Sequence, residues 1–287
     1  MAILWALATA FCFACGIVLV RQALPHTNAV TAAWFVVGFN AIALCPIFFF
    51  YPFPDLSSHI AVDIALTAFL APFLARIFQY LSLDAIGVTR TAVIVGTTPV
   101  LAVLLAVTFL GEPVTVPLLA GALATAVGVM VIVYEKTLTS TTGKVYLVLP
   151  LAAALAFASR DVFGRVDMAD FHHPLVIAAL VPSAAFIFFS GLLLVGPGRF
   201  RFTLRPGAMR FLVPAGVAYT LSDLFTFLAQ GSGQVVVVAP ALHSTPLFAL
   251  FLSYLFLREQ ERLSKRIVIG VVVVLTGVAL TVVDGAN

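Results

Sequence analysis

The sequence predicts an all-α integral membrane protein with ten transmembrane helices, arranged as two inverted five-helix repeats. Hydrophobic residues make up 62% of the 287 residues, whereas charged residues make up only 9%. A soluble globular chain carries about 25% charged residues, so this chain has too few to cover a surface facing water. Apolar runs of about 20 residues, the length that crosses a hydrocarbon core, account for most of the sequence.

An internal duplication is the second observation. The stretch 96–112, GTTPVLAVLLAVTFLGE, returns 147 residues later as 243–259, HSTPLFALFLSYLFLRE. The two stretches align without a gap and share seven of 17 positions, including the pair Thr98-Pro99. The segments that follow them also match, after a two-residue insertion. Repetition at this scale indicates that the fold consists of two copies of one unit.

Five apolar spans form the first repeat, which we assign to residues 1–134. They cover about 2–20, 28–50, 61–83, 88–110 and 114–134. The end of the first span, 11–21, resembles 155–165 in the second half, so the first span belongs to the mature fold rather than to a cleaved signal peptide. A short polar segment, 135–144, is the predicted linker.

Five further spans form the second repeat, residues 145–287. They cover about 145–163, 174–195, 211–229, 235–257 and 267–283. Because five is an odd number, equivalent helices of the two repeats cross the membrane in opposite directions, as in many secondary transporters. Small residues, among them Gly128 in the fifth span and Gly270 in the tenth, are predicted packing positions at which each span can approach a neighbouring helix closely.

The motifs of the fourth and fifth spans resemble those of the EamA family of the drug/metabolite transporter superfamily. They are the Thr-Pro pair at Thr98, the Phe-Leu-Gly-Glu exit at 109–112 and the Gly-x6-Gly-Val of 121–129. With the doubled arrangement of ten helices, the resemblance covers essentially the whole chain. It implies a transporter of small metabolites, commonly amino acids or related compounds, with a central cavity lined by helices of both repeats.

Two proline-interrupted segments at matching positions are the first candidate substrate site. Each proline removes one backbone donor and leaves the carbonyl four residues earlier without its usual partner. Such groups at mid-membrane depth are acceptable facing a cavity or another helix, and they point to the binding site of a repeated transporter. A packing kink is the alternative interpretation. The residues concerned are Thr97, Thr98, Pro99, Ser244, Thr245 and Pro246.

Ionisable residues inside the spans are the second candidate site, because charges in a membrane are costly and mark functional positions. Arg76 and Asp223 stand 147 residues apart, at equivalent positions of the repeats. Arg76 is suited to a substrate carboxylate through its planar fork, and Asp223 to an amine or a proton. Tyr80 is included in this site. The alternative is a structural ion pair between the repeats.

Three side chains are candidates for proton coupling: Asp223, His243 and Asp161. His243 titrates near neutral pH but is equally suited to a hydrogen bond within the bundle. Arg160 and Asp161 either belong to a salt bridge at the end of a helix or open onto the mouth of the cavity. The sequence predicts no metal site, cofactor or nucleic-acid surface.

The predicted function is secondary transport of small polar or amphipathic metabolites by alternating access, with export favoured, in the cell membrane. A phosphorylated-metabolite or nucleotide-sugar exchanger of the same superfamily is the alternative, and an integral-membrane enzyme a remote one. The expected partners are a small-molecule substrate, the lipid bilayer and a coupling proton, with the monomer favoured. Twelve basic residues gather on one side, which the positive-inside rule places in the cytoplasm with both termini outside. The family resemblance implies the reverse.

Overall fold

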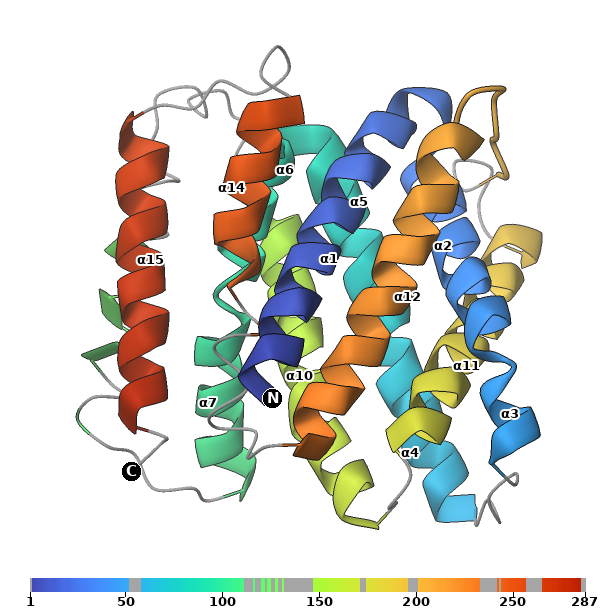
Figure 1. Cartoon of the computed structure of the whole chain (residues 1–287), viewed down its shortest axis with the longest axis horizontal. Coiled ribbons are helices and arrows are strands. Elements are labelled where there is room, and N and C mark those ends of the chain that lie inside the picture. Colours follow the sequence, from blue (N-terminus) through green and yellow to red (C-terminus); the bar gives the residue numbers. More distant parts are fainter. Residues whose placement is uncertain are drawn as a thin grey trace.

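The helices of the computed structural model stand side by side as a bundle, drawn roughly upright in Figure 1. No β-strand occurs among the described residues, whose one bridge, Thr27 with Leu204, is isolated. The all-α prediction is therefore confirmed for them. The structure describes residues 2–51, 58–110, 116, 120–121, 123–124, 127–128, 131, 147–170, 174–195, 201–232, 242, 244–256 and 265–284.

The first half of the chain follows the predicted spans, with breaks inside three of them. Its elements are α1 (Ala2–Ala23), the 3-10 turn η1 (Leu24–His26), α2 (Ala29–Leu44), α3 (Ile47–Phe50), α4 (Ser58–Ala68), the π-helical turn η2 (Phe69–Leu74), α5 (Ala75–Ile86), α6 (Val88–Val95) and α7 (Thr98–Leu110). The fifth predicted span and the linker 135–144 lie mostly or wholly outside the described residues.

The second half contains the equivalents of these helices. They are α10 (Val148–Asp170), α11 (Pro174–Val195), α12 (Met209–Ser232), α14 (Thr245–Phe256) and α15 (Lys265–Asp284). The first part of the ninth predicted span precedes α14 and lies outside the described residues. Four described helical stretches are long and apolar enough to cross a membrane: Leu4–His26, Ala29–Phe50, His59–Ile86 and Leu175–Val195. The total of ten spans stays a prediction.

Prolines explain two of the breaks. Pro46 separates α2 from α3, and Pro72 lies in η2 between α4 and α5. A proline cannot donate the helical hydrogen bond and pushes the residue before it toward extended backbone. Ala71 has this conformation, with φ −152° and ψ 121°. The third predicted span is therefore a helix that is broken near its middle.

Helices of one repeat pack mainly against helices of the other. α1 packs along α12 and α14, and its equivalent α10 packs along η2–α5 and α6–α7, which are the equivalents of α12 and α14. α2 packs against its own equivalent α11. In Figure 1 the chain rises through α4 and α5 and descends through the equivalent α12. The two halves therefore share one core, and the same helix pairs recur when the repeats are exchanged.

The predicted role of Gly128 as a packing position is confirmed, and its partner is α15. A Cβ atom at this position would lie 2.7 Å from the backbone nitrogen of Val274 and 2.9 Å from the carbonyl oxygen of Gly270. Only a glycine allows the two backbones to approach this closely. The sequence therefore indicated a close approach at Gly128, and the structure adds that α15 is the partner.

One extended segment ties the two repeats together at the upper end of Figure 1. Residues 201–208, which we call the strap, lie before α12 and bond to the connection between α1 and α2. The backbone nitrogen of Arg205 donates to the His26 carbonyl at 2.9 Å. The Thr27 hydroxyl donates to the Thr203 carbonyl at 2.6 Å, and the Thr203 nitrogen donates to the Thr31 hydroxyl at 3.1 Å.

Asn28 serves both α2 and the strap. Its Oδ1 accepts from the Thr31 backbone nitrogen at 2.8 Å and caps α2, while its Nδ2 donates to the Arg201 carbonyl at 2.8 Å. We expect Asn28→Ala to lower the free energy of unfolding by about 1–2 kcal/mol, since the cap and one hydrogen bond are lost. Thermal unfolding in detergent measures the effect. Asn28→Asp keeps the cap and should lose less; an alanine variant as stable as the wild type would contradict this account.

Candidate functional site

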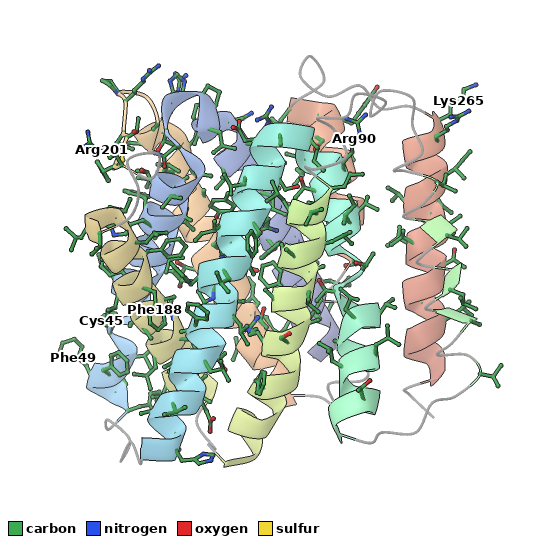
Figure 2. All side chains as sticks on the ribbon, turned by 180° about the vertical axis from the view of Figure 1, so that it is seen from behind. Cys45, Phe49, Arg90, Phe188, Arg201 and Lys265 are labelled. Carbon is green, nitrogen blue, oxygen red and sulfur yellow. The ribbon has the colours of Figure 1, made fainter. Side chains whose placement is uncertain are left out.

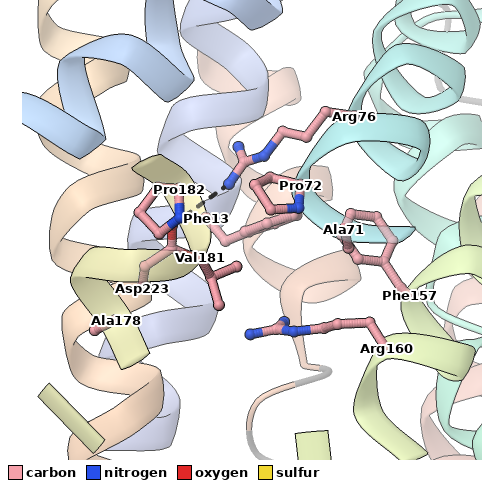
Figure 3. A pocket seen from close by; sticks show the side chains of 10 residues that line it. All are labelled: Phe13, Ala71, Pro72, Arg76, Phe157, Arg160, Ala178, Val181, Pro182 and Asp223. Carbon is pink, nitrogen blue, oxygen red and sulfur yellow. Dashed lines mark ion pairs between the residues drawn. The ribbon is translucent and has the colours of Figure 1, made fainter. Parts of the chain in front are cut away.

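Arg76 and Asp223 meet at the centre of the bundle. Arg76 lies in the first turn of α5, and its side chain is 3% exposed. Its Nη2 lies 3.7 Å from Oδ2 of Asp223 in the middle of α12. Figure 3 shows this ion pair as a dashed line. The two positions that the duplication makes equivalent are therefore in contact across the repeats.

Polar neighbours complete the pair. Asn40 of α2 donates from Nδ2 to the same Asp223 oxygen at 2.5 Å. Arg76 donates from Nη1 to the Tyr80 hydroxyl, one turn later in α5, at 3.4 Å. A buried ion pair is favourable only when further hydrogen bonds satisfy its remaining polar atoms. Asn40 meets part of this requirement for Asp223, and Tyr80 does so for Arg76.

Aromatic rings hold the guanidinium from its face. The Arg76 Cζ lies 3.9 Å from the centroid of the Tyr219 ring and 5.7 Å from that of Phe13. Phe13 in turn packs edge-on against Tyr219, with centroids 5.2 Å apart. Cation–π contacts of this kind stabilise a desolvated arginine by about 2 kcal/mol. They compensate in part for removing the charge from water.

Several buried polar atoms at this level have no hydrogen-bond partner among the described residues. They include Nε of Arg76, Oδ1 of Asn40 and both amide atoms of Gln79. Gln79 is fully buried, between Arg76 and Tyr80 in sequence. Unsatisfied polar groups in a native interior call for an explanation, such as water or a ligand. The described residues therefore leave hydrogen-bonding capacity unused at Arg76 and close to it.

A small cavity opens beside the ion pair (Figure 3). Its volume of about 40 Å³ is enough for about three water molecules, at about 10–15 Å³ each. The Asp223 side chain, 25% exposed, faces it. The cavity is lined by Phe13, Ala71, Pro72, Arg76, Phe157, Arg160, Ala178, Val181, Pro182 and Asp223. A metabolite larger than this space enters only when helices or side chains around it move.

The cavity lies in the half of the bundle that is remote from the strap. Ala178 is four residues from the start of α11, and Asp223 is nine residues from the end of α12. At 1.5 Å per residue these positions lie about 6 and 14 Å along the helix axis from those ends, which are the lower ends of α11 and α12 in Figure 1. The break at Ala71 and Pro72 forms part of the wall. The proline-broken helix therefore borders the site.

The threonines of the first candidate site cap their own helix breaks. The Thr97 hydroxyl donates to the Ile94 carbonyl at 2.7 Å, and the Thr98 hydroxyl donates to the Val95 carbonyl at 2.5 Å. Val95 is four residues before Pro99, so Thr98 satisfies the carbonyl that this proline leaves free. In the second repeat the Thr245 hydroxyl donates to the Leu242 carbonyl at 3.4 Å. Neither Thr97 nor Thr98 is among the residues lining the cavity.

The remaining predicted residues are described only in part. Pro99 and Pro246 are the second residues of α7 and α14, and their side chains are outside the described part of the chain. Ser244 directly precedes α14. His243 lies outside the described residues, and Asp161 lies in α10 with its side chain outside them. The structure thus brings together Arg76, Tyr80 and Asp223 of the predicted set.

Sequence reasoning missed most of the walls of this site. Asn40, Tyr219, Phe13 and Phe157 surround the pair but were not predicted. Asn40 carried a usable signal, since it is a polar residue inside an otherwise apolar span. The aromatic residues carried none, because the chain has 26 phenylalanines and an aromatic residue in an apolar span is ordinarily a packing residue.

Comparisons with known proteins give the family. The model of the EamA-like transporter family matches the chain twice, over residues 1–134 and 144–283. A solved structure entitled "Crystal structure of protein" is 13% identical, with a TM-score of 0.70, and the match covers 99% of this chain and 97% of that one. At this identity the likeness shows the shared fold alone. No curated protein matches the chain. The chain therefore belongs to the EamA-like transporter family of the drug/metabolite transporter superfamily and is a membrane transporter.

Proposed function

We propose that the chain is a secondary transporter that exports amino acids or related small amphipathic metabolites across the cell membrane by alternating access. The observation that carries this proposal is the Arg76–Asp223 pair beside a cavity in the middle of the bundle. A planar guanidinium binds a carboxylate through two parallel hydrogen bonds, and a carboxylate binds an amine. A substrate that carries both groups can replace each partner of the pair by one of its own charges.

The rest of the cavity fits the apolar part of such a substrate. Phe13, Phe157, Pro72 and Val181 line it, and they offer aromatic and aliphatic surface. Binding sites for small molecules combine mostly apolar walls with a few polar groups that fix orientation. This composition favours an amphipathic metabolite over a strongly hydrated one.

Arg160 supports the alternative substrate class. It lines the same cavity as Arg76, so two guanidinium groups border one space (Figure 3). Arginine clusters are typical of sites that bind phosphate. A phosphorylated metabolite is therefore the second candidate, although Asp223 in the same wall opposes a multiply charged anion.

Alternating access is supported by the relation between the repeats. The equivalents α4–α5 and α12 run in opposite directions in Figure 1, and the contacts of α1 recur for α10. In an inverted repeat, exchanging the conformations of the two halves moves the opening from one membrane face to the other. We assign proton coupling first to Asp223, because it faces the cavity; His243 and Asp161 remain candidates. A monomer already contains both halves of the site.

Counterflow into proteoliposomes tests the proposed function. Proteoliposomes that contain the wild-type protein are preloaded with unlabelled compound. They are then offered labelled amino acids, amines or phosphorylated metabolites outside, each with and without a proton gradient. We expect uptake of one amino acid or amine class, and a response to the gradient if Asp223 carries the proton. Uptake of phosphorylated compounds alone would favour the alternative. Absence of uptake by folded protein would contradict both.

The two threonines that cap the helix breaks are expected to shape the site through the backbone. We predict that Thr98→Val with Thr245→Val weakens substrate affinity about tenfold, because two carbonyls lose their hydroxyl partners and the breaks rearrange. The apparent affinity in the counterflow assay measures this. Thr108→Val is the control, since its hydroxyl also bonds the carbonyl of the preceding turn, Leu104, but on an exposed face. Transport constants equal to those of the wild type would contradict this role of the two threonines.

The charge asymmetry predicts how the protein lies in the membrane. Arg90, Arg201 and Lys265 all lie at the same end of the bundle, at the top of Figure 2. The positive-inside rule places this end in the cytoplasm and the end of α15, at the lower end of Figure 1, outside. A reporter that fluoresces only in the cytoplasm, fused after Asn287, should stay dark. A bright fusion would show that the family's usual orientation holds for this chain.

A further inference from the structure

The strap presents arginine side chains to the surroundings at the basic end of the bundle. Arg201 and Arg205 are exposed on it, and Arg210 is exposed in the first turn of α12. The Arg210 Cζ lies 4.7 Å from the centroid of the Phe211 ring. Three guanidinium groups thus lie within ten residues of chain. Their position next to the start of a membrane helix is the depth at which lipid headgroups lie.

The backbone that carries these arginines is fixed. A turn at Pro206 and Gly207 is closed by the Ala208 nitrogen, which donates to the Arg205 carbonyl at 3.1 Å. Gly207 has φ +95°, and a type II turn requires such a positive φ at its third residue. Leu204 packs against the core, and the hydrogen bonds to the α1–α2 connection hold the opposite side. A prearranged set of donors binds an anion with less loss of conformational freedom.

Apolar side chains alternate with the arginines. Phe202 is 53% exposed and packs edge-on against Trp34 of α2, with centroids 5.6 Å apart. Met209 is 42% exposed. Aromatic and apolar side chains among basic ones are typical of segments that rest at the boundary between headgroups and acyl chains. The surface therefore suits a ligand with an anionic head and an apolar body.

The protein supplies no anion to these arginines within the described residues. The described ion pairs are Arg21 with Asp84, His59 with Asp63, and Arg76 with Asp223, and none involves the strap. Asp84, the described acidic residue at this end of α5, is held by Arg21 at 3.1 Å. No strap residue lines the central cavity, so the arginines do not belong to the substrate site. Their positive charge is directed outward.

We propose that the strap and Arg210 bind the phosphate of an anionic phospholipid in the leaflet at the basic end of the protein. Arginine forks match phosphate oxygens and form two hydrogen bonds to them at once. Basic residues beside a membrane helix attract anionic lipids, each by about fivefold in affinity. The exposed Phe202 and Met209 contact the upper acyl chains. Because the strap also links the two repeats, the bound lipid stabilises the contact between them.

Native mass spectrometry of the detergent-solubilised full chain tests this assignment. Dioleoyl phosphatidylglycerol and dioleoyl phosphatidylcholine, which differ only in the headgroup, are titrated separately. We expect wild-type protein to prefer phosphatidylglycerol. The variant Arg201→Gln with Arg205→Gln should lose about 25-fold in affinity for it, at about fivefold per arginine, with little change for phosphatidylcholine. Thermal unfolding checks that the variant is folded.

A matched variant separates the strap from general charge. Lys265→Gln with Arg266→Gln removes the same charge from exposed residues of α15, on the other side of the bundle from Arg201 (Figure 2), and should change the affinity of the strap for phosphatidylglycerol by less than about threefold, because distant exposed charges are screened. Equal losses in both variants would overturn the proposal. So would equal affinity of the wild type for the two lipids, a result that needs no variant. Displacement of the lipid by an equal concentration of glycerol 3-phosphate would assign the site to a soluble phosphate ester instead.

Discussion

Asp223→Asn should abolish transport and destabilise the protein more than Arg76→Gln does. The asparagine variant leaves a guanidinium that is 3% exposed without a counter-ion, which costs about 3 kcal/mol in the free energy of unfolding. Arg76→Gln leaves Asp223 with its Asn40 donor and a 25% exposed side chain, so its cost should be about 1–2 kcal/mol. Thermal unfolding and counterflow measure both effects.

The double variant Arg76→Gln with Asp223→Asn distinguishes a binding role from a structural one. With no charge left unpaired, its stability should return to within about 1 kcal/mol of the wild type. Its transport should stay lowered by about 100-fold or more, because both groups proposed to bind the substrate are gone. A double variant that is stable and transports normally would show that the pair is only structural.

Gly16→Ala should impair the site through the aromatic ring that packs on Arg76, without altering a polar group of the ion pair. A Cβ atom at Gly16 of α1 would lie 2.7 Å from Cε2 of Tyr219, a distance that real Cβ atoms do not tolerate. Tyr219 is fully buried, and its ring lies 3.9 Å from the Arg76 guanidinium. The ring must move or α1 must separate from α12. We expect a loss of about 1–3 kcal/mol in the free energy of unfolding, with reduced transport.

Gly191→Ala is the matched control for this prediction. It makes the same change in α11, where an added Cβ atom meets nothing within 4 Å. Its free energy of unfolding should rise by about 0.5–1 kcal/mol, because alanine stabilises a helix relative to glycine. Its transport should not change. If the two variants unfold and transport alike, the contact between Gly16 and Tyr219 does not position Arg76.

Composition and duplication were sufficient to predict the main features of the fold. A chain with 9% charged residues has few alternatives to a helical bundle in lipid, and its apolar runs locate the helices. The breaks were harder to place. Pro72 was visible in the sequence, but neither its position beside the cavity nor the extended backbone at Ala71 follows from local pattern. These depend on the packing of η2 against α10 and α11.

The structure brings the two predicted charges, Arg76 and Asp223, into contact and adds surroundings that were not predicted. Arg76 and Asp223 could be paired from sequence because the duplication made their positions equivalent and because isolated charges are costly in a membrane. Tyr219 and Phe13 could not, since an aromatic residue in an apolar span is ordinarily a packing residue. Thr97 and Thr98 share polarity with site residues, yet in this structure their hydroxyls bond the preceding turn.

Thiol labelling at position 157 tests most directly whether the cavity binds the transported molecule. In a variant with Cys12→Ala, Cys15→Ala, Cys45→Ala and Phe157→Cys, a small thiol reagent reports access to the cavity wall, and Lys265→Cys in the same cysteine-free background serves as the control at an exposed helix end. We expect the compound taken up in counterflow to slow labelling at position 157 severalfold and to leave labelling at position 265 unaffected. Equal labelling rates at position 157 with and without a saturating concentration of that compound would contradict the assignment of the substrate to this cavity.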